Sequence, residues 1–170
     1  DLRAVFHKTR EPIPGYARVF ALESLKSRFA YAFEGHKYYP SICEARALED
    51  TIRIGDITVR TVDQPHGGIS SAGLRFEYDG KSICYATDFG DITDEMRKMY
   101  KGCDIFIVDA LRETPHPTHA HLDMTLDLIN SVKPAFSLLT HMDKSMDYHG
   151  LKAKLPSGIA PAYDGLTMEI

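Results

Sequence analysis

The sequence predicts an α/β fold, in which strands and helices share one core. Alternating apolar and polar residues over Ile57–Val62 are typical of a strand with one buried face. The continuous apolar run Ile105–Val108 is typical of a strand covered on both faces, and a helical segment, Leu122–Val132, follows it. With 170 residues and 44% hydrophobic content, the chain is long enough for one domain and too short for two. We therefore expect a single domain over residues 1–170.

The composition excludes several classes of function. The net charge is −4 and Lys and Arg form no run, so we expect no nucleic-acid partner. The three cysteines, Cys43, Cys84 and Cys103, include no Cys-x-x-Cys pair, which argues against a disulfide framework and a thiolate zinc site. Cys84 and Cys103 are instead expected in the core. No membrane-spanning segment or signal peptide is visible, so we expect no membrane partner and a cytoplasmic location.

The first part of the chain is expected to contain one strand and one helix. Two prolines indicate a turn-rich stop over Glu11–Gly15, because the residue before a proline is pushed away from helix. A strand is expected over Tyr16–Phe20. The segment 33–41 is expected to be an exposed loop, and His7 and His36 to be surface residues. Apolar residues at helical spacing predict an amphipathic helix whose aromatic rings pack in the core; these residues are Leu22, Leu25, Phe29 and Phe33.

Two β-hairpins are predicted in the middle of the chain. Thr51–Ile54 and Ile57–Val62 alternate in polarity and flank a Gly-Asp turn. Leu74–Tyr78 alternates in the same way. The turn Asp79-Gly80 is expected to join it to the short apolar strand Ile83–Ala86.

The second half of the chain is expected to alternate helices with strands. A short helix is expected over Thr93–Tyr100, with Asp91 or the first residue of that segment as its cap. A strand over Ser137–Thr140 and a short helix over Asp147–Lys154 follow. The last segment, Ala162–Ile170, is expected to form a turn and a final strand.

Three of the predicted strands lead into a potential metal ligand. His66, Asp88 and His141 each come at or just after the end of a strand-like run. Taken alone, a histidine or an aspartate in such a place is more often a loop, core or turn residue. Because the pattern is repeated, and because imidazole nitrogen and carboxylate oxygen suit zinc or manganese, we expect these residues to form a metal site.

A dense group of histidines lies between the strand Ile105–Val108 and the following helix. His116, His119 and His121 fall within six residues. An imidazole there is suited to general acid or base catalysis, or to binding an anion, because it titrates near neutral pH. The alternative is that these histidines are caps and surface residues at the start of a helix.

The motifs together resemble the metallo-β-lactamase fold hydrolases. Within that superfamily they are most similar to the phosphodiesterase branch that opens phosphoribosyl 1,2-cyclic phosphates. The resemblance runs over most of the chain and implies an αββα sandwich. The segments that carry it are Gln64-Pro-His66-Gly, Tyr85-Ala-Thr-Asp88, Val108-Asp-Ala-Leu-Arg112, His116-Pro-Thr-His119, Leu139-Thr-His141-Met and Pro161-Ala-Tyr-Asp-Gly165.

The resemblance implies a centre with two divalent metal ions, zinc or manganese, in the complete enzyme. His66 matches a ligand of the first metal, Asp88 the ligand that bridges both, and His141 a ligand of the second. The implied reaction is attack of a metal-bridged hydroxide on a small cyclic phosphate or a nucleotide-like phosphoester.

The segment 116–121, called the histidine loop, and the preceding Arg112 supply the remaining implied roles. His119 matches the residue that protonates or orients the leaving oxygen, and His121 is the competing alignment. Arg112 and His116 are expected to bind the anionic substrate.

One family signature is absent from this sequence. The His-x-His-x-Asp-His run that supplies the other ligands does not occur, and in the family it comes just before a segment resembling Asp1–Arg3. We therefore expect the chain to be the C-terminal part of such an enzyme, with an N-terminally incomplete sandwich that binds metal poorly and is inactive alone. We also expect an uncovered apolar sheet face, which a second copy or a retained N-terminal piece would cover.

Two other functions stay open. One is a thioester or lactone hydrolase of the same fold. The other is a non-catalytic, metal-free scaffold domain in which His66, Asp88 and His141 are relics.

Overall fold

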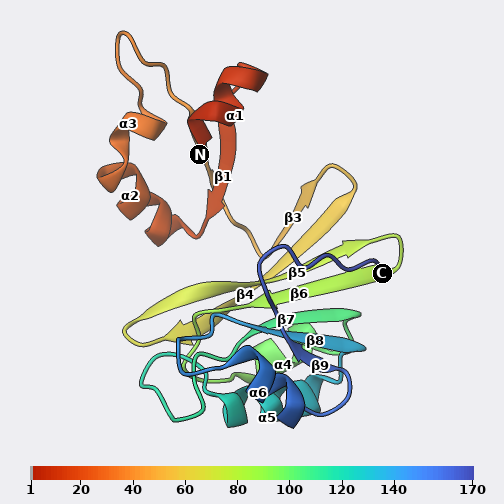
Figure 1. Cartoon of the computed structure of the whole chain (residues 1–170). Coiled ribbons are helices and arrows are strands. Elements are labelled where there is room, and N and C mark those ends of the chain that lie inside the picture. Colours follow the sequence, from red (N-terminus) through yellow and green to blue (C-terminus); the bar gives the residue numbers. More distant parts are fainter. Residues whose placement is uncertain (1) are drawn as a thin grey trace. The chain divides into compact units, whose positions relative to one another are not determined.

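The chain divides into two compact units, Asp1–Glu49 and Asp50–Ile170 (Figure 1). The computed structural model describes residues 2–170, and Asp1 lies outside the described residues. The expectation of one domain over residues 1–170 stays a prediction. Every helix within the described residues is too short or too polar to span a lipid bilayer.

The first unit, as far as it is described, combines helices with a small parallel sheet. β1 pairs with β2, from Ile13 opposite Cys43 to Ala17 opposite Ala47. A small core contains Phe6 from α1, Ala32 from α3, and Ile42 and Cys43 at the entry to β2. The elements are α1 (Leu2–Thr9), β1 (Ile13–Ala17), α2 (Val19–Arg28), α3 (Ala30–Phe33) and β2 (Cys43–Ala47).

The strand expected over Tyr16–Phe20 is wrong in position, because β1 ends at Ala17 and a helix begins at Val19. The two prolines were the misleading signal. Proline keeps the preceding residue extended, which suits an outer strand of a sheet as well as it suits a turn. Pro14 accordingly lies inside β1, opposite Glu44.

The amphipathic helix expected after this strand is divided into two. Phe29, with φ −123° and ψ 38°, ends α2 and precedes α3. Its side chain is 44% exposed, so the expectation that every aromatic ring of this stripe packs in the core is wrong for Phe29. The predicted surface positions of His7 and His36 are confirmed, since both residues are exposed.

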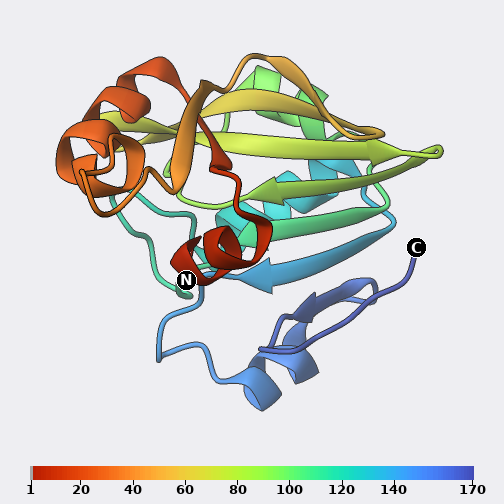
Figure 2. The same ribbon diagram turned by 90° about the horizontal axis from the view of Figure 1, so that it is seen from above.

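The second unit is built on one large sheet with the strand order β3-β4-β5-β6-β7-β8-β9 (Figure 2). Pairing is antiparallel from β3 to β6 and parallel from β6 to β9. Both predicted hairpins are confirmed, with Ile54 opposite Ile57 and Tyr78 opposite Lys81. The strands are β3 (Thr51–Ile54), β4 (Ile57–His66), β5 (Ile69–Tyr78), β6 (Lys81–Ala86), β7 (Ile105–Asp109), β8 (Phe136–Thr140) and β9 (Ile159–Pro161).

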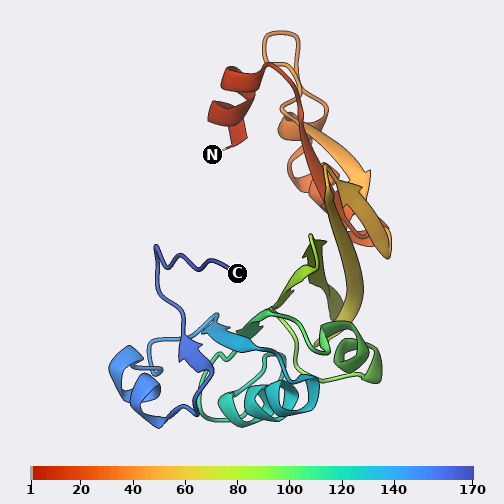
Figure 3. The ribbon, with the colours of Figure 1, turned by 90° about the vertical axis from the view of Figure 1, so that its right-hand side faces the viewer.

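Three helices of this unit cover one face of the sheet (Figures 1 and 3). They are α4 (Asp94–Tyr100), α5 (Leu122–Val132) and α6 (Tyr148–Lys154). Thr93 caps α4, because its hydroxyl accepts the Met96 N–H. The core between the helices and the sheet confirms the predicted burial of two cysteines and includes Cys84, Cys103, Phe89, Tyr100, Phe106, Val108, Leu128 and Leu139.

The opposite face of the sheet carries apolar side chains that are partly exposed. Cys84 and Ala86 belong to the helix-covered core, so Ile83 and Tyr85, which alternate with them on β6, point to the other face. The register places Phe76 opposite Ile83 on that face. Tyr85 is 40% exposed, and the expectation of an uncovered apolar sheet face stays a prediction.

The final strand expected in Ala162–Ile170 is wrong. The last strand is β9, Ile159–Pro161, and the segment after it contains a turn and no strand. Leu166, Met168 and Ile170 alternate with polar residues as in a strand. Alternation alone does not make a strand, because a strand also needs a neighbour that accepts its backbone hydrogen bonds.

We expect Thr93→Ala to lower the free energy of unfolding of the protein by about 1 kcal/mol, because the Met96 N–H loses its cap. Urea unfolding of the full-length protein measures the change. Asp91→Ala is the matched control, since within residues 2–170 Asp91 accepts the neighbouring Ile92 N–H and does not cap the helix. Equal losses for the two variants would contradict the assignment of the cap.

The Asp104 carboxylate is expected to contribute to the free energy of unfolding in a pH-dependent way. Its Oδ2 accepts the Ser82 N–H at 2.8 Å and the Ser82 hydroxyl at 3.1 Å, and these bonds lower the pKa of Asp104. A carboxyl whose pKa is lowered by folding stabilises the protein above its unfolded pKa, and the contribution is lost as the pH falls through the folded pKa.

We therefore expect Asp104→Ala to destabilise the protein at pH 7 and to have a progressively smaller effect as the pH falls below about 4. Urea unfolding of wild type and variant over this pH range provides the measurement. A loss that stays constant down to pH 3 would show that the carboxylate charge is not involved.

Candidate metal centre

The candidate metal centre lies where four strands of the large sheet end. β6, β7 and β8 are parallel, and β4 runs in the same direction because both β4 and β6 are antiparallel to β5. Their carboxyl ends therefore lie along one edge of the sheet. His66 and Asp109 are the last residues of β4 and β7, Asp88 comes two residues after β6, and His141 directly follows β8.

His66 is oriented by the histidine loop. Its Nδ1 lies 2.8 Å from the Thr118 carbonyl oxygen, which can only accept, so Nδ1 carries the proton. The Nε2 lone pair is then free to bind a cation, and a backbone carbonyl in this role is common around metal-binding histidines.

Asp88 sits in an unusual backbone conformation, with φ of 60°. Its N–H donates to Asp109 Oδ2 at 3.1 Å, and its carbonyl accepts the Ser71 hydroxyl at 2.8 Å. His141, which follows β8, also has a positive φ, of 59°. These turns bring His141 Nε2 to 3.6 Å from Asp88 Oδ1.

His119 lies at the centre of the cluster. Its Nδ1 is 3.4 Å from Asp109 Oδ2 and 3.8 Å from Asp88 Oδ1. Its ring centroid is 4.7 Å from that of His66 and 5.0 Å from that of His141. The structure thus brings the three predicted metal ligands and the predicted catalytic histidine together.

Asp109 lies beside His119 and the Asp88 N–H, although no role in the site was predicted for it from the sequence. Its side chain is fully buried, and its Oδ1 has no hydrogen-bond partner within residues 2–170. Burial raises the pKa of Asp109, while His141, His119 and the Asp88 N–H act in the opposite direction. The missed signal was the same as for Asp88, an acid at the end of an apolar strand.

The residues present fit a divalent cation. Two sets of side chains each offer donor atoms that lie within 4.8 Å of one another: His66, Asp88 and His119, and Asp109, His119 and His141. Imidazole nitrogen and carboxylate oxygen suit zinc and manganese. A buried carboxylate oxygen without a donor is also expected where a cation compensates its charge.

The predicted substrate-binding residues take different places. The His116 ring lies tilted against that of His119, with ring centroids 5.1 Å apart, and the pKa of His116 is lowered by desolvation and by the Arg112 charge. The Arg112 guanidinium donates to the carbonyls of Thr114 and Pro115, so it fastens the histidine loop. A role of Arg112 or His116 in binding substrate stays a prediction.

His121 is set apart from the other histidines by its local role. It occupies the position before α5, where its carbonyl accepts the Thr125 N–H. Its Nδ1 is buried without a hydrogen-bond partner in the described part of the chain. The geometry gives His119, and not His121, the contacts with Asp88 and Asp109.

The family of the chain follows from comparison with known proteins. A sequence profile described as the beta-lactamase superfamily domain matches residues 1–142. The chain belongs to this superfamily. The resemblance drawn from the sequence motifs and the predicted α/β fold are both confirmed.

Solved structures of other proteins share the fold of this chain. A diphosphatase from the PhnP family is 31% identical, with a TM-score of 0.81, over 92% of this chain and 57% of that one. YhfI from Bacillus subtilis, a metallo-beta-lactamase fold protein, is 16% identical, with a TM-score of 0.80, over 99% of this chain and 70% of that one. Zn(2+)-bound PqqB from Methylobacterium extorquens is 15% identical, with a TM-score of 0.74, over 99% and 68% of the two chains.

A curated protein that is similar in sequence to this chain is named for an acyl-transfer activity and not for a phosphatase activity. It is an octanoyltransferase from Porphyromonas gingivalis (strain ATCC BAA-308 / W83), 27% identical over 173 residues. The match covers 98% of this chain and 34% of that protein. The chain therefore spans about a third of the length of this relative and 57% of the PhnP-family structure.

We expect Gly90→Ala to lower the free energy of unfolding by about 1–3 kcal/mol. A Cβ at Gly90 would lie 2.8 Å from the backbone carbonyl carbon of Thr118, so the histidine loop would have to shift. Urea unfolding measures the loss. Gly68→Ala is the matched control, because a Cβ there meets nothing within 4 Å. Equal stabilities of the two variants would contradict close packing of the loop on Gly90.

Proposed function

We propose that this chain carries the second part of the active site of a metal-dependent phosphodiesterase. The substrate class is a small cyclic phosphate or a nucleotide-like phosphoester. The observation that carries the proposal is His119, whose Nδ1 faces Asp109 and Asp88 while its ring lies between those of His66 and His141. The similarity to a diphosphatase from the PhnP family supports the phosphate chemistry.

His66, Asp88 and His141 would hold divalent cations, zinc or manganese. Two such cations, when bound, would neutralise charge on the phosphoryl oxygens and lower the pKa of a water molecule. The chain's contribution is to fix the donors. The Thr118 carbonyl sets the tautomer of His66, and backbone hydrogen bonds on both sides of Asp88 hold its carboxylate at the edge of the sheet.

His119 would move the proton to the leaving oxygen. Asp109 lies on the Nδ1 side of its ring, 3.4 Å away, and favours a proton on that nitrogen. Nε2 is then the nitrogen that exchanges a proton with the substrate, and it acts as a general acid toward the leaving group when the ring carries both protons. Because Asp109 is fully buried, it orients the imidazole without competing for substrate.

The second candidate is a thioester or lactone hydrolase. One observation favours it, the similarity to a protein named octanoyltransferase, because an octanoyl group is an acyl group. That match covers 34% of the relative, so we place this function second.

The test is turnover of bis(para-nitrophenyl) phosphate by the full-length protein with added manganese or zinc. We expect Asp88→Ala and His141→Ala to lower kcat/KM by about a hundredfold or more. We expect His119→Ala to lower kcat by about 10²–10⁴ while the metal content is retained, because it removes a general acid and not a ligand.

The matched control is His149→Ala, an exposed histidine on α6. Turnover that is indifferent to Asp88→Ala and His141→Ala would rule out the proposed site. Loss of metal in His119→Ala would make His119 a ligand. Faster turnover of acyl thioesters or lactones than of phosphodiesters would favour the second candidate.

A further inference from the structure

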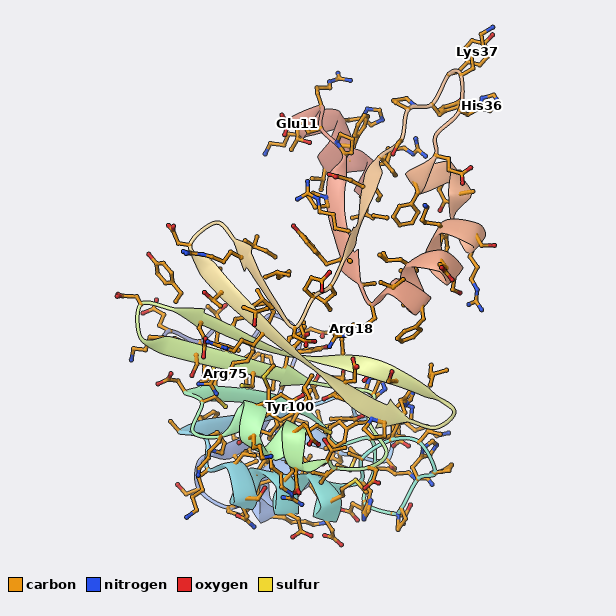
Figure 4. All side chains as sticks on the ribbon, turned by 180° about the vertical axis from the view of Figure 1, so that it is seen from behind. Glu11, Arg18, His36, Lys37, Arg75 and Tyr100 are labelled. Carbon is orange, nitrogen blue, oxygen red and sulfur yellow. The ribbon has the colours of Figure 1, made fainter. Side chains whose placement is uncertain are left out.

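A buried polar chain connects α4 with the backbone of Asp88. Tyr100, the last residue of α4, is fully buried and lies between that helix and the sheet (Figure 4). Its hydroxyl is 2.6 Å from Gln64 Oε1. Gln64 lies on β4, two residues before His66, and is also fully buried.

The far end of the Gln64 side chain reaches the turn that carries Asp88. Its Nε2 donates to the Thr87 carbonyl and to the Ser71 hydroxyl, each at 2.8 Å. The Ser71 hydroxyl in turn donates to the Asp88 carbonyl at 2.8 Å. Three side chains from α4, β4 and β5 therefore end on the two carbonyls that flank the Asp88 N–H.

The donors and acceptors of these hydrogen bonds follow from their chemistry. Carbonyl oxygens only accept, so the NH₂ end of Gln64 must face Thr87. The Ser71 hydroxyl must donate to a backbone carbonyl, and that of Asp88 at 2.8 Å is nearer than that of Thr87 at 3.2 Å. The Gln64 oxygen then faces Tyr100, which must donate to it. Burial raises the pKa of Tyr100, which keeps the phenol protonated as this donation requires.

The sheet leaves room for the phenol at one place. A Cβ on Gly73 would lie 1.7 Å from the Tyr100 hydroxyl and 2.7 Å from Gln64 Oε1. Glycine inside a strand weakens it and often marks the close approach of another group. Here that group is the Tyr100–Gln64 hydrogen bond.

We propose that Tyr100, acting through Gln64 and Ser71, is a positioning residue that holds Asp88 in its metal-binding conformation. Asp88 has φ of 60°, which a non-glycine residue keeps only if the surroundings hold it there. The Asp109 carboxylate accepts the N–H of Asp88, and Ser71, the last member of the Tyr100–Gln64–Ser71 series, donates to the Asp88 carbonyl. The inference rests on the proposed function only in taking Asp88 as a metal ligand.

The test is the affinity of the metal-free full-length protein for manganese and zinc, measured by calorimetry well below the unfolding temperature. We expect Tyr100→Phe, which keeps the ring against Phe106, to weaken binding about tenfold, the size of effect usual for groups that orient a ligand. Hydrogen exchange of the Asp88 amide should become faster in the same variant.

Ser71→Ala removes the last donor of the chain and should weaken binding to a similar extent. Ser137→Ala is its matched control, because the buried Ser137 hydroxyl has no hydrogen-bond partner in the described residues. If Tyr100 acts through the hydrogen bonds of Gln64 and Ser71, the double variant Tyr100→Phe/Ser71→Ala loses less metal affinity than the product of the two single losses.

An unchanged metal affinity in Tyr100→Phe, with a lowered unfolding temperature alone, would overturn the inference and leave Tyr100 a packing residue. Multiplicative losses in the double variant would overturn the route through Ser71. If the wild-type protein binds neither metal, the proposed function is refuted. This result differs from unchanged metal affinity in Tyr100→Phe, which refutes only the positioning role of Tyr100.

Discussion

The site depends on one buried carboxylate, that of Asp109. A carboxylate removed from water is unstable unless donors or cations surround it, and Asp109 is fully buried. Its Oδ2 receives the Asp88 N–H and faces His119, so the end of β6 and the histidine loop are both drawn to the end of β7. Its Oδ1 has no hydrogen-bond donor within residues 2–170, which suits a cation at this place. The positions of the Asp88 N–H and of the His119 ring therefore follow from the hydrogen bonds that the buried Asp109 carboxylate requires.

The convergence of His66, Asp88 and His141 was predictable because the signals in the sequence are local. His66, Asp88 and His141 each follow a strand-like run, and strands that run in one direction place their carboxyl ends at one edge. Asp109 carries the same signal, but its importance comes from burial. The loop after β7 folds back so that the Leu111 N–H donates to the Ala120 carbonyl, and His119 in this loop lies against Asp109. No periodicity in the sequence reports such a contact.

The fold was predictable where hydrogen-bond partners are adjacent in the chain. The hairpin that joins Tyr78 to Lys81 and the helix Leu122–Val132 have their expected positions. The errors fell on the strand around Pro14 and on the segment Ala162–Ile170, where the pairing partner is remote or absent among residues 2–170. A strand is a property of two segments, and one segment shows only that it is suited to pair.

The positive φ angles of Asp88 and His141 have a consequence for the evolutionary history of such chains. A left-handed backbone costs a non-glycine residue about 1–2 kcal/mol, and glycine avoids this cost. While selection maintains the chemistry, these two positions keep their side chains and the protein bears the strain. Once selection is relaxed, drift to glycine at either position is favoured by stability itself. Among the non-glycine residues with positive φ, Asp88 and His141 are the two in the candidate metal centre, so glycine at either position would mark a descendant that no longer maintains this centre.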